Sequence, residues 1–376
     1  MSYPIIETMQ SDCYGSISTI TCGSSFTGQD AEYKSIPASY TDNGDGTITD
    51  NNTGLMWQQN PGSAMSLDDA IAGADSLNLA GYDDWRLPTI KELYSLMDFR
   101  GEDVSICMTG DCDESLPIPF IDTDYFSYFE YGSDGPRIID SQYVSSNIYV
   151  GDNTIDDQMV FGLNLADGRI KGYGTTMMGQ PKLFMCMYVR GNPSYGVNNF
   201  LDNNDGTITD NATGLTWMQN DNGEGVLWED AMKYCEELTF ADKSDWRLPD
   251  AKELQSIVDY SRAPGATDSP AIDPVFNSTE IIDENGNRNW GYYFTSTTHA
   301  SYNFDAESTG GWAVYVAFGE SLGNINGDGI WYDVHGAGSQ RSDPKGGDPA
   351  EYEDGHGPQG DSVRIYNFAR CVRGGI

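Results

Sequence analysis

The sequence predicts an α+β fold built from two tandem repeats, and three observations support this prediction. First, nearly the same run of residues occurs twice, as DNGDGTITDNNTGLMWQQN from Asp42 and DNNDGTITDNATGLTWMQN from Asp202. Second, DWRLP occurs at Asp84–Pro88 and again at Asp245–Pro249. Third, each repeat places two helical segments before several strand-like runs and long Gly/Asp-rich loops, an order typical of α+β domains.

The elements of each repeat can be assigned from local signals. GTITD and GLMW are expected to be short strands, because NNTG between them permits a tight turn. A helix is expected over Leu67–Leu77 in the first repeat and over Trp228–Leu238 in the second. After DWRLP a second helix begins at Thr89 or Asp250, each followed three positions later by Glu, as in a capping box. Further strands are expected at YYFTST, WAVYVAFG and ARCVRG.

The repeats define the domain organisation. Their period, 160 positions from Asp42 to Asp202, is too long for a solenoid, so each repeat is predicted to be a complete domain. We call residues 1–39 the leader, residues 40–192 domain one and residues 193–376 domain two. The leader contains SISTIT, which alternates Ser or Thr with Ile. It is expected to dock on a domain face, or to add as a strand to a neighbouring subunit.

Composition excludes some partners and favours one compartment. The 376 residues include 58 acidic and 20 basic ones, a net charge of −38, which repels nucleic acid and anionic lipid. No apolar run is long enough to span a membrane, so no membrane insertion is expected. None of the seven cysteines forms a CxxC pair, which argues against a zinc site. The close pairs Cys13/Cys22 and Cys107/Cys112 are typical of loop disulfides and favour an extracellular location.

These motifs, with the closing GPQGDSVRIYNFARCVRGG, resemble the Lcl C-terminal domain family, named after a bacterial collagen-like adhesin. That family looks related to C-type lectins and to formylglycine-generating enzymes. The resemblance implies two tandem C-type-lectin-like domains, each with two helices and a small antiparallel sheet with long loops. It also implies a secreted or surface-exposed bacterial protein, usually one without assigned catalysis.

DWRLP has a structural and a catalytic interpretation. In the structural one, Trp85 and Trp246 are buried at the helix entry, while Arg86 and Arg247 pair with carboxylates of their own domain. A catalytic motif would need a nucleophile or base repeated beside it, and none is. The structural interpretation is therefore preferred.

The resemblance also implies a disulfide between Cys235 and Cys371, which domain one replaces by Ala74 and Tyr188. Cys186 is then unmatched. It is either a buried free thiol or a partner of one of the leader cysteines.

Domain two is the better candidate for ligand binding. It has Trp312 where domain one has Met159, and it contains a long insertion from about Gly319 to Gly360. In C-type lectin folds the long-loop region carries the ligand. Trp312, Trp331 and Tyr332 are therefore candidates to stack on a sugar, with core packing as the alternative.

Three oxygen-rich turns are candidate calcium sites, with hairpin-turn chemistry as the alternative. The third, NINGDG, has the initial spacing of an EF-type loop but has His335 at the position of its bidentate Glu. The candidate ligands are Asp42, Asp45, Asp202, Asp205, Asn324, Asn326 and Asp328.

We expect a non-catalytic extracellular surface or matrix protein that is adhesive or assembles into fibres through its leader. Its partners would be further copies of itself, another surface protein or a glycan. The alternative is calcium-assisted, lectin-like binding of a glycan or protein through the domain-two insertion. No enzyme is expected, because no motif supports a Ser/His/Asp site around His335 or His356, and Cys235 and Cys371 are assigned to a structural disulfide.

Overall fold

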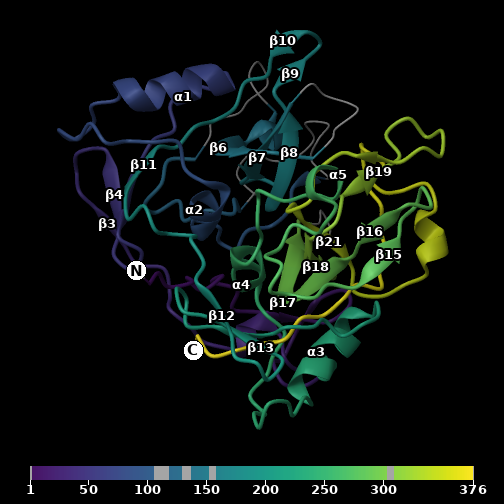
Figure 1. Ribbon diagram of the computed structural model, residues 1–376. Helices are drawn as coiled ribbons and strands as arrows, with labels where there is room; N and C mark the ends of the chain where they lie inside the picture. The colour runs from purple at the N-terminus through teal and green to yellow at the C-terminus, as the bar shows by residue number, and fades with distance from the viewer. Residues whose placement is uncertain (1, 106–117, 129–136, 152–157, 303–308, 376) are drawn as a thin grey trace.

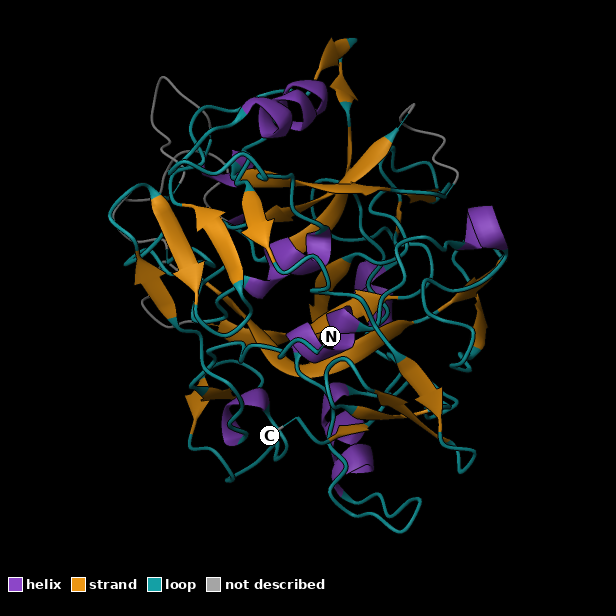
Figure 2. Cartoon of the chain, turned by 60° about the vertical axis from the view of Figure 1, so that its left-hand side comes forward, coloured by secondary structure: helices purple, strands orange, loops and turns teal. Residues whose placement is uncertain are grey.

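The computed structural model describes residues 2–105, 118–128, 137–151, 158–302 and 309–375 (Figure 1). Its helices are few and short and lie among strands and long loops (Figure 2). The α-helices are α1 (Leu67–Ser76), α2 (Ile90–Ser95), α3 (Trp228–Glu236), α4 (Ala251–Ser256) and α5 (Pro264–Thr267). This is the predicted α+β class, with two repeated halves.

Each repeat contains a four-stranded antiparallel sheet that is closed by its last strand. In domain one the order is β11-β5-β4-β3, and in domain two it is β12-β13-β14-β22. GTITD and the strand after it pair as predicted, with Ile48 opposite Trp57 and Ile208 opposite Trp217. The strands are β3 (Tyr40–Asp42), β4 (Thr47–Asp50), β5 (Leu55–Gln58), β11 (Val189–Gly191), β12 (Phe200–Asp202), β13 (Thr207–Asp210), β14 (Thr216–Met218) and β22 (Val372–Arg373).

A six-stranded sheet in the order β17-β18-β21-β8-β7-β6 joins the two repeats. Three of its strands come from each repeat, and the junction pairs Gln340 of β21 with Ile170 of β8. The strands are β6 (Gln142–Ile148), β7 (Met159–Asn164), β8 (Arg169–Gly174), β17 (Tyr292–Ser301), β18 (Thr309–Ala317) and β21 (Gln340–Pro344). The boundary at residues 192 and 193 therefore separates the repeats along the chain but not in space.

Four further pairs of short strands, each two or three residues long, lie outside these sheets. The leader forms one hairpin, and another projects from domain one at the top of Figure 1. The strands are β1 (Cys13–Tyr14), β2 (Thr19–Ile20), β9 (Thr176–Met177), β10 (Gln180–Pro181), β15 (Glu280–Ile282), β16 (Arg288–Trp290), β19 (Leu322–Gly323) and β20 (Tyr332–Asp333).

The helix after DWRLP begins with a capping box in both repeats, as predicted. Thr89 and Asp250 are the N-caps, and each accepts a hydrogen bond from the backbone of the Glu three residues later.

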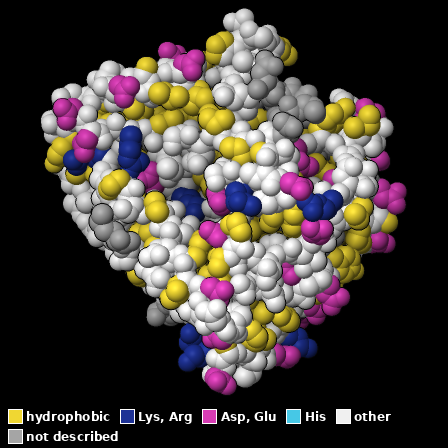
Figure 3. Space-filling view, viewed as in Figure 1, with side chains coloured by type: hydrophobic (Ala, Val, Ile, Leu, Met, Phe, Trp, Pro, Cys, Tyr) yellow, Lys and Arg dark blue, Asp and Glu magenta, His cyan; other side chains and the backbone are white. Residues whose placement is uncertain are grey.

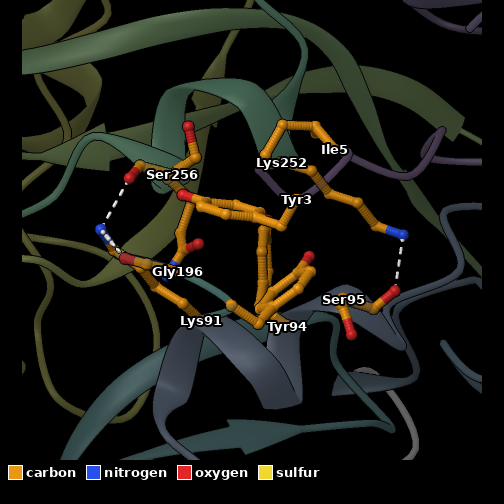
Figure 4. Close-up of a pocket in the computed structure, with 10 residues that line it drawn as sticks. Tyr3, Ile5, Lys91, Tyr94, Ser95, Gly196, Lys252 and Ser256 are labelled. Atoms are coloured by element: carbon orange, nitrogen blue, oxygen red, sulfur yellow. Dashed lines mark hydrogen bonds between the residues drawn. The ribbon is translucent and has the colours of Figure 1, made fainter. Parts of the chain in front are cut away.

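The two capped helices, α2 and α4, contact each other across the junction between the repeats (Figure 4). Lys91 of α2 donates to the carbonyl of Ser256 at the end of α4. Lys252 of α4 donates in turn to the carbonyl of Ser95 at the end of α2, so the contact is reciprocal. Burial lowers the pKa of both lysines to about 8.

DWRLP has the predicted structural role. Trp85 and Trp246 are buried, as are Trp57 and Trp217 of the preceding strands. Their indoles anchor the sheet and the helix entry of each repeat. The arginines of the motif pair with the capping-box glutamates: Arg86 with Glu92, and Arg247 with Glu253.

Two disulfides lie in the described residues. Cys235 of α3 is bonded to Cys371 before β22, with Cα atoms 5.5 Å apart, as the resemblance implies. Cys13 is bonded to Cys22 within the leader. Cys186 is a buried free thiol, and burial raises its pKa to about 12. Cys107 and Cys112 lie outside the described residues.

The leader packs on its own chain and crosses the junction between the repeats. The backbone N–H of Tyr3 donates to the carbonyl of Ala212, and Tyr3 lies among buried side chains of both repeats. Further along, the side-chain amide of Gln10 bonds both the N–H and the carbonyl of Thr298 in β17. Phe26 packs on Trp228 of α3 with ring centroids 6.1 Å apart. The leader is thus part of the folded core.

Candidate functional site

The largest described cleft, about 900 Å³, lies on the seam between the two repeats. Its floor is formed by the neighbouring strands β8 and β21. Side chains two residues apart on a strand point to the same face, which explains why Arg169, Lys171 and Tyr173 of β8 all line it. Arg341 and Asp343 line it from β21 in the same way. This volume falls within the range usual for small-molecule sites.

A close backbone contact also joins β8 to the segment that precedes β21. The N–H of Gly172 in β8 donates to the carbonyl of His335, 2.8 Å away. A Cβ at position 172 would lie 2.8 Å from that carbonyl oxygen, so only glycine fits there.

The cleft differs from the rest of the protein in charge. Five Lys or Arg residues and four Asp residues among the described residues line it, although the whole chain has 20 basic and 58 acidic residues. The lining is therefore balanced in charge within a strongly negative molecule. An uncharged or weakly acidic ligand can enter it, because the local field does not follow the net charge.

On the domain-one side the charged groups form a compact network. The guanidinium of Arg169 lies 2.8 Å from the carboxylate of Asp103. The ammonium of Lys171 bonds Asp167. Burial alone would raise the pKa of Asp103, but Arg169 overrides it and holds the pKa below its usual value. Burial lowers the pKa of Lys171 despite its contact with Asp167. The network fixes these long side chains in place.

On the domain-two side, Asp361 joins two partners. One of its oxygens lies 2.6 Å from Nε2 of His335, and the other accepts from Arg341. Burial would raise the pKa of Asp361, but Arg341 and His335 hold it well below its usual range. Burial lowers the pKa of His335 to about 4, so the ring is neutral at pH 7.

His299 connects the two sides beneath the cleft. Its Nε2 lies 2.8 Å from the carbonyl of Asp167, so Nε2 carries the proton and Nδ1 is left as an acceptor. Ser342 lies 3.4 Å from that Nδ1. The ring stacks on Phe120, and burial lowers its pKa to about 4. His299 is thus a neutral, buried link between the repeats.

An aromatic wall closes the cleft on the domain-two side. Trp312 is partly exposed and contacts Tyr352 and His356, with ring centroids 6.4 and 5.0 Å apart. Of the three aromatic residues predicted to bind ligand, Trp312 lines the cleft, whereas Trp331 and Tyr332 do not. Trp331 is held by its backbone to the side chain of Asn285, and Tyr332 belongs to β20.

The predicted calcium turns use their oxygens to cap their own backbones. Asp42 accepts from the N–H of Gly44, and Asp202 accepts from the N–H of Asn204. Asp45 and Asp205 accept in the same way from Thr47 and Thr207. These are the bonds of an ordinary Asx turn.

The third turn behaves similarly. Asn324 accepts from the N–H of Gly329 and Asp328 from that of Ile330, while Asn326 is exposed. In the described part of the chain no group of three or more His, Cys, Asp or Glu side chains is arranged to hold a metal ion.

Sequence reasoning missed the charged residues of the cleft, although one signal was available. GRIKG places Arg169 and Lys171 on one strand face, and Arg341 follows in QRSDP. Such concentrations of basic residues are unusual in a chain this acidic.

The fold and the site define a two-repeat α+β protein with a large cleft between its repeats. The sequence profile of the Lcl C-terminal domain matches residues 46–186 and 206–329, and the chain belongs to this family. Searches of curated proteins and of solved structures gave no match. Within the described residues, no helix has the length and hydropathy of a membrane span.

Proposed function

We propose that this is a non-catalytic, extracellular binding protein of the adhesive type, and that it holds an oligosaccharide in the cleft between its repeats. The observation that carries the proposal is the cleft itself, a volume of about 900 Å³ with a charge-balanced floor and Trp312 on its wall. The two disulfides of the described residues support a location outside the reducing cytosol. We further propose that each repeat has a C-type-lectin-like fold.

The chemistry of the lining favours a sugar. A pyranose has apolar C–H faces, which pack on an aromatic ring, and hydroxyl groups, which bond to charged planar groups. The cleft offers Trp312 and Tyr173 for the faces, and the carboxylates and guanidinium groups of Asp361, Arg169 and Arg341 for the hydroxyls. Asp361 already bonds Arg341, and Arg169 already pairs with Asp103. These groups are therefore held in place before a ligand arrives, which lowers the entropy lost on binding.

The leader supports adhesion over fibre assembly. Tyr3 and Gln10 are buried against the two repeats of their own chain. A leader in this position is not free to add as a strand to a neighbouring subunit. Fibre formation would therefore need a release step that adhesion does not.

A glycan array, with and without calcium, tests the proposal. We expect the protein to retain a set of oligosaccharides, and Trp312→Ala to weaken their binding at least tenfold. Trp331→Ala is the matched control, because this tryptophan lies in domain two but outside the cleft. Calcium is expected to have no large effect, since the candidate turns already bond their own backbones. No binding by the wild type, or equal binding by Trp312→Ala, would contradict the proposal.

A further inference from the structure

Both repeats have a groove between their first helix, α1 or α3, and the DWRLP segment. Arg86 and Arg247 occupy the same place in the repeated motif. Ser146 of β6 donates from its N–H to the carbonyl of Pro88, 2.8 Å away, and Ser296 of β17 donates to that of Pro249 at the same distance. Each groove is thus bounded by a helix, the DWRLP segment and an edge strand of the six-stranded sheet.

In domain two the leader fills this groove. Asp30 accepts a hydrogen bond from the hydroxyl of Thr297 in β17. Tyr33 lies over the guanidinium of Arg247, with 5.4 Å from ring centroid to Cζ, and its hydroxyl bonds Glu236 of α3. The cavity left beside Arg247 is only about 10 Å³, and the Arg247 side chain is 6% exposed.

In domain one the corresponding groove is open. Two cavities adjoin Arg86, one of about 370 Å³ that reaches Ile71 of α1 and one of about 760 Å³ that reaches Asn147 of β6. The Arg86 side chain is 33% exposed. Ile71 of α1 is 49% exposed, whereas Met232 at the same position of α3 is fully buried. Figure 3 shows hydrophobic side chains gathered below α1 on this face of the molecule. The two grooves therefore share a construction and differ in whether a chain segment covers them.

We propose that the open groove of domain one binds an extended polypeptide segment from a partner protein, in the way that domain two binds the leader. The chain has one leader and two grooves. Because the leader is docked in domain two, we assign the groove of domain one to a segment of another polypeptide.

The residues of the groove define the chemistry of this segment. Arg86 presents its guanidinium for an aromatic side chain, as Arg247 does for Tyr33. Asn147 of β6 is equivalent to Thr297 of β17. The side chain of Asn147 accepts from the N–H of Ile90, just as that of Thr297 accepts from the N–H of Ala251. The amide of Asn147 can donate to a carboxylate there. The occupant thus carries an acidic residue followed closely by an aromatic one, as in the spacing of Asp30 and Tyr33.

Isothermal titration calorimetry on the full chain tests this. The probe is a synthetic peptide of residues 24–36, which contains Asp30 and Tyr33. We expect one peptide per chain, and at least tenfold weaker binding to Ile71→Glu. The control Ile282→Glu changes an exposed residue of β15 in domain two and should bind like the wild type. A peptide with Tyr33→Ala should bind at least tenfold more weakly than the original.

Two results would overturn the proposal. One is no binding of the peptide at millimolar concentration. The other is binding that Ile71→Glu leaves unchanged, which would mean that the peptide replaces the leader in domain two. Should Ile71→Glu fail to fold, Ser146→Tyr serves instead, because it fills the groove from the exposed edge of β6. The glycan array above is independent of this groove, so either proposal can fail alone.

Discussion

The guanidinium of Arg247 forms two hydrogen bonds, of 2.5 and 2.6 Å, to the carboxylate of Glu253, and both side chains are almost fully buried. The first repeat has the same pair, Arg86 with Glu92, at the same distances, but there the arginine is one-third exposed. The two copies thus differ in solvent access and not in geometry. Tyr33 of the leader lies over Arg247, which also donates to the carbonyl of Gly374, and both contacts help to cover its guanidinium.

This difference in solvent access predicts that replacing the arginine by Met lowers the free energy of unfolding by different amounts in the two repeats. Arg247→Met leaves the Glu253 charge buried without its partner, which costs about 3–5 kcal/mol of unfolding free energy. Arg86→Met should cost clearly less, because water reaches Glu92 through the space that Arg86 vacates. Urea unfolding of both variants measures the two losses, and equal losses would contradict the account.

The disulfide between Cys235 and Cys371 should stabilise the chain more than the leader disulfide does. It joins residues 136 positions apart, whereas Cys13 and Cys22 are only nine apart. The chain-entropy treatment gives about 5 kcal/mol for the long loop and about 3 kcal/mol for the short one. Thermal melting of the two double Cys→Ala variants should reproduce this order. A larger loss from the leader variant would count against it.

Gln10 should be a stabilising residue although it lies in the leader. Its side-chain amide is bonded to both the N–H and the carbonyl of the fully buried Thr298. Gln10→Ala leaves these two groups without that partner, at a cost of about 1–3 kcal/mol for each buried group. Ile17→Ala is the control, because Ile17 is an exposed leader residue. Chemical unfolding in which the two variants behave alike would refute the docked position of the leader.

The neutral state of His335 predicts a pH dependence of stability. Burial lowers its pKa to about 4 in the folded protein, from 6.5. Between these values an unfolded chain binds a proton that the folded chain does not. The contribution of His335 to the free energy of unfolding therefore falls by up to about 3 kcal/mol as the pH drops from 6.5 towards 4.

The test compares the wild type with His335→Gln, because other groups titrate in the same range. His299 acts in the same direction as His335. Burial raises the pKa of Asp333 and Asp343 to about 6, so these two groups act in the opposite direction. Above pH 7 the free-energy difference between the two proteins should be constant, and below pH 6.5 it should shift in favour of the variant. A difference that stays constant down to pH 4.5 would show that His335 is not held neutral by burial.

The sequence predicted the parts of the fold that depend on neighbouring residues. The capping boxes at Thr89 and Asp250, the strands around Trp57 and the buried indole of Trp85 all follow from short, repeated signals. Because each signal acts over a few residues, it can be identified before the fold is known.

The junction between the repeats could not be predicted in this way. It depends on β21 lying beside β8, a pairing of residues 170 positions apart at Ile170 and Gln340. The cleft above it collects Asp103, Arg169 and Asp361 from three distant segments. GRIKG marks Arg169 locally, but no local pattern connects it with Asp103 and Asp361. Of the aromatic residues predicted to bind ligand, only Trp312 lies in the cleft.

The central claim, that one ligand occupies a cleft built by both repeats, is tested most directly by amide hydrogen exchange with an oligosaccharide retained on the array. We predict that the bound sugar slows exchange in β8 of domain one and in residues 356–363 of domain two together, and that Trp312→Ala abolishes both effects. Slower exchange confined to one repeat, or centred on Trp331 and Tyr332, would contradict it.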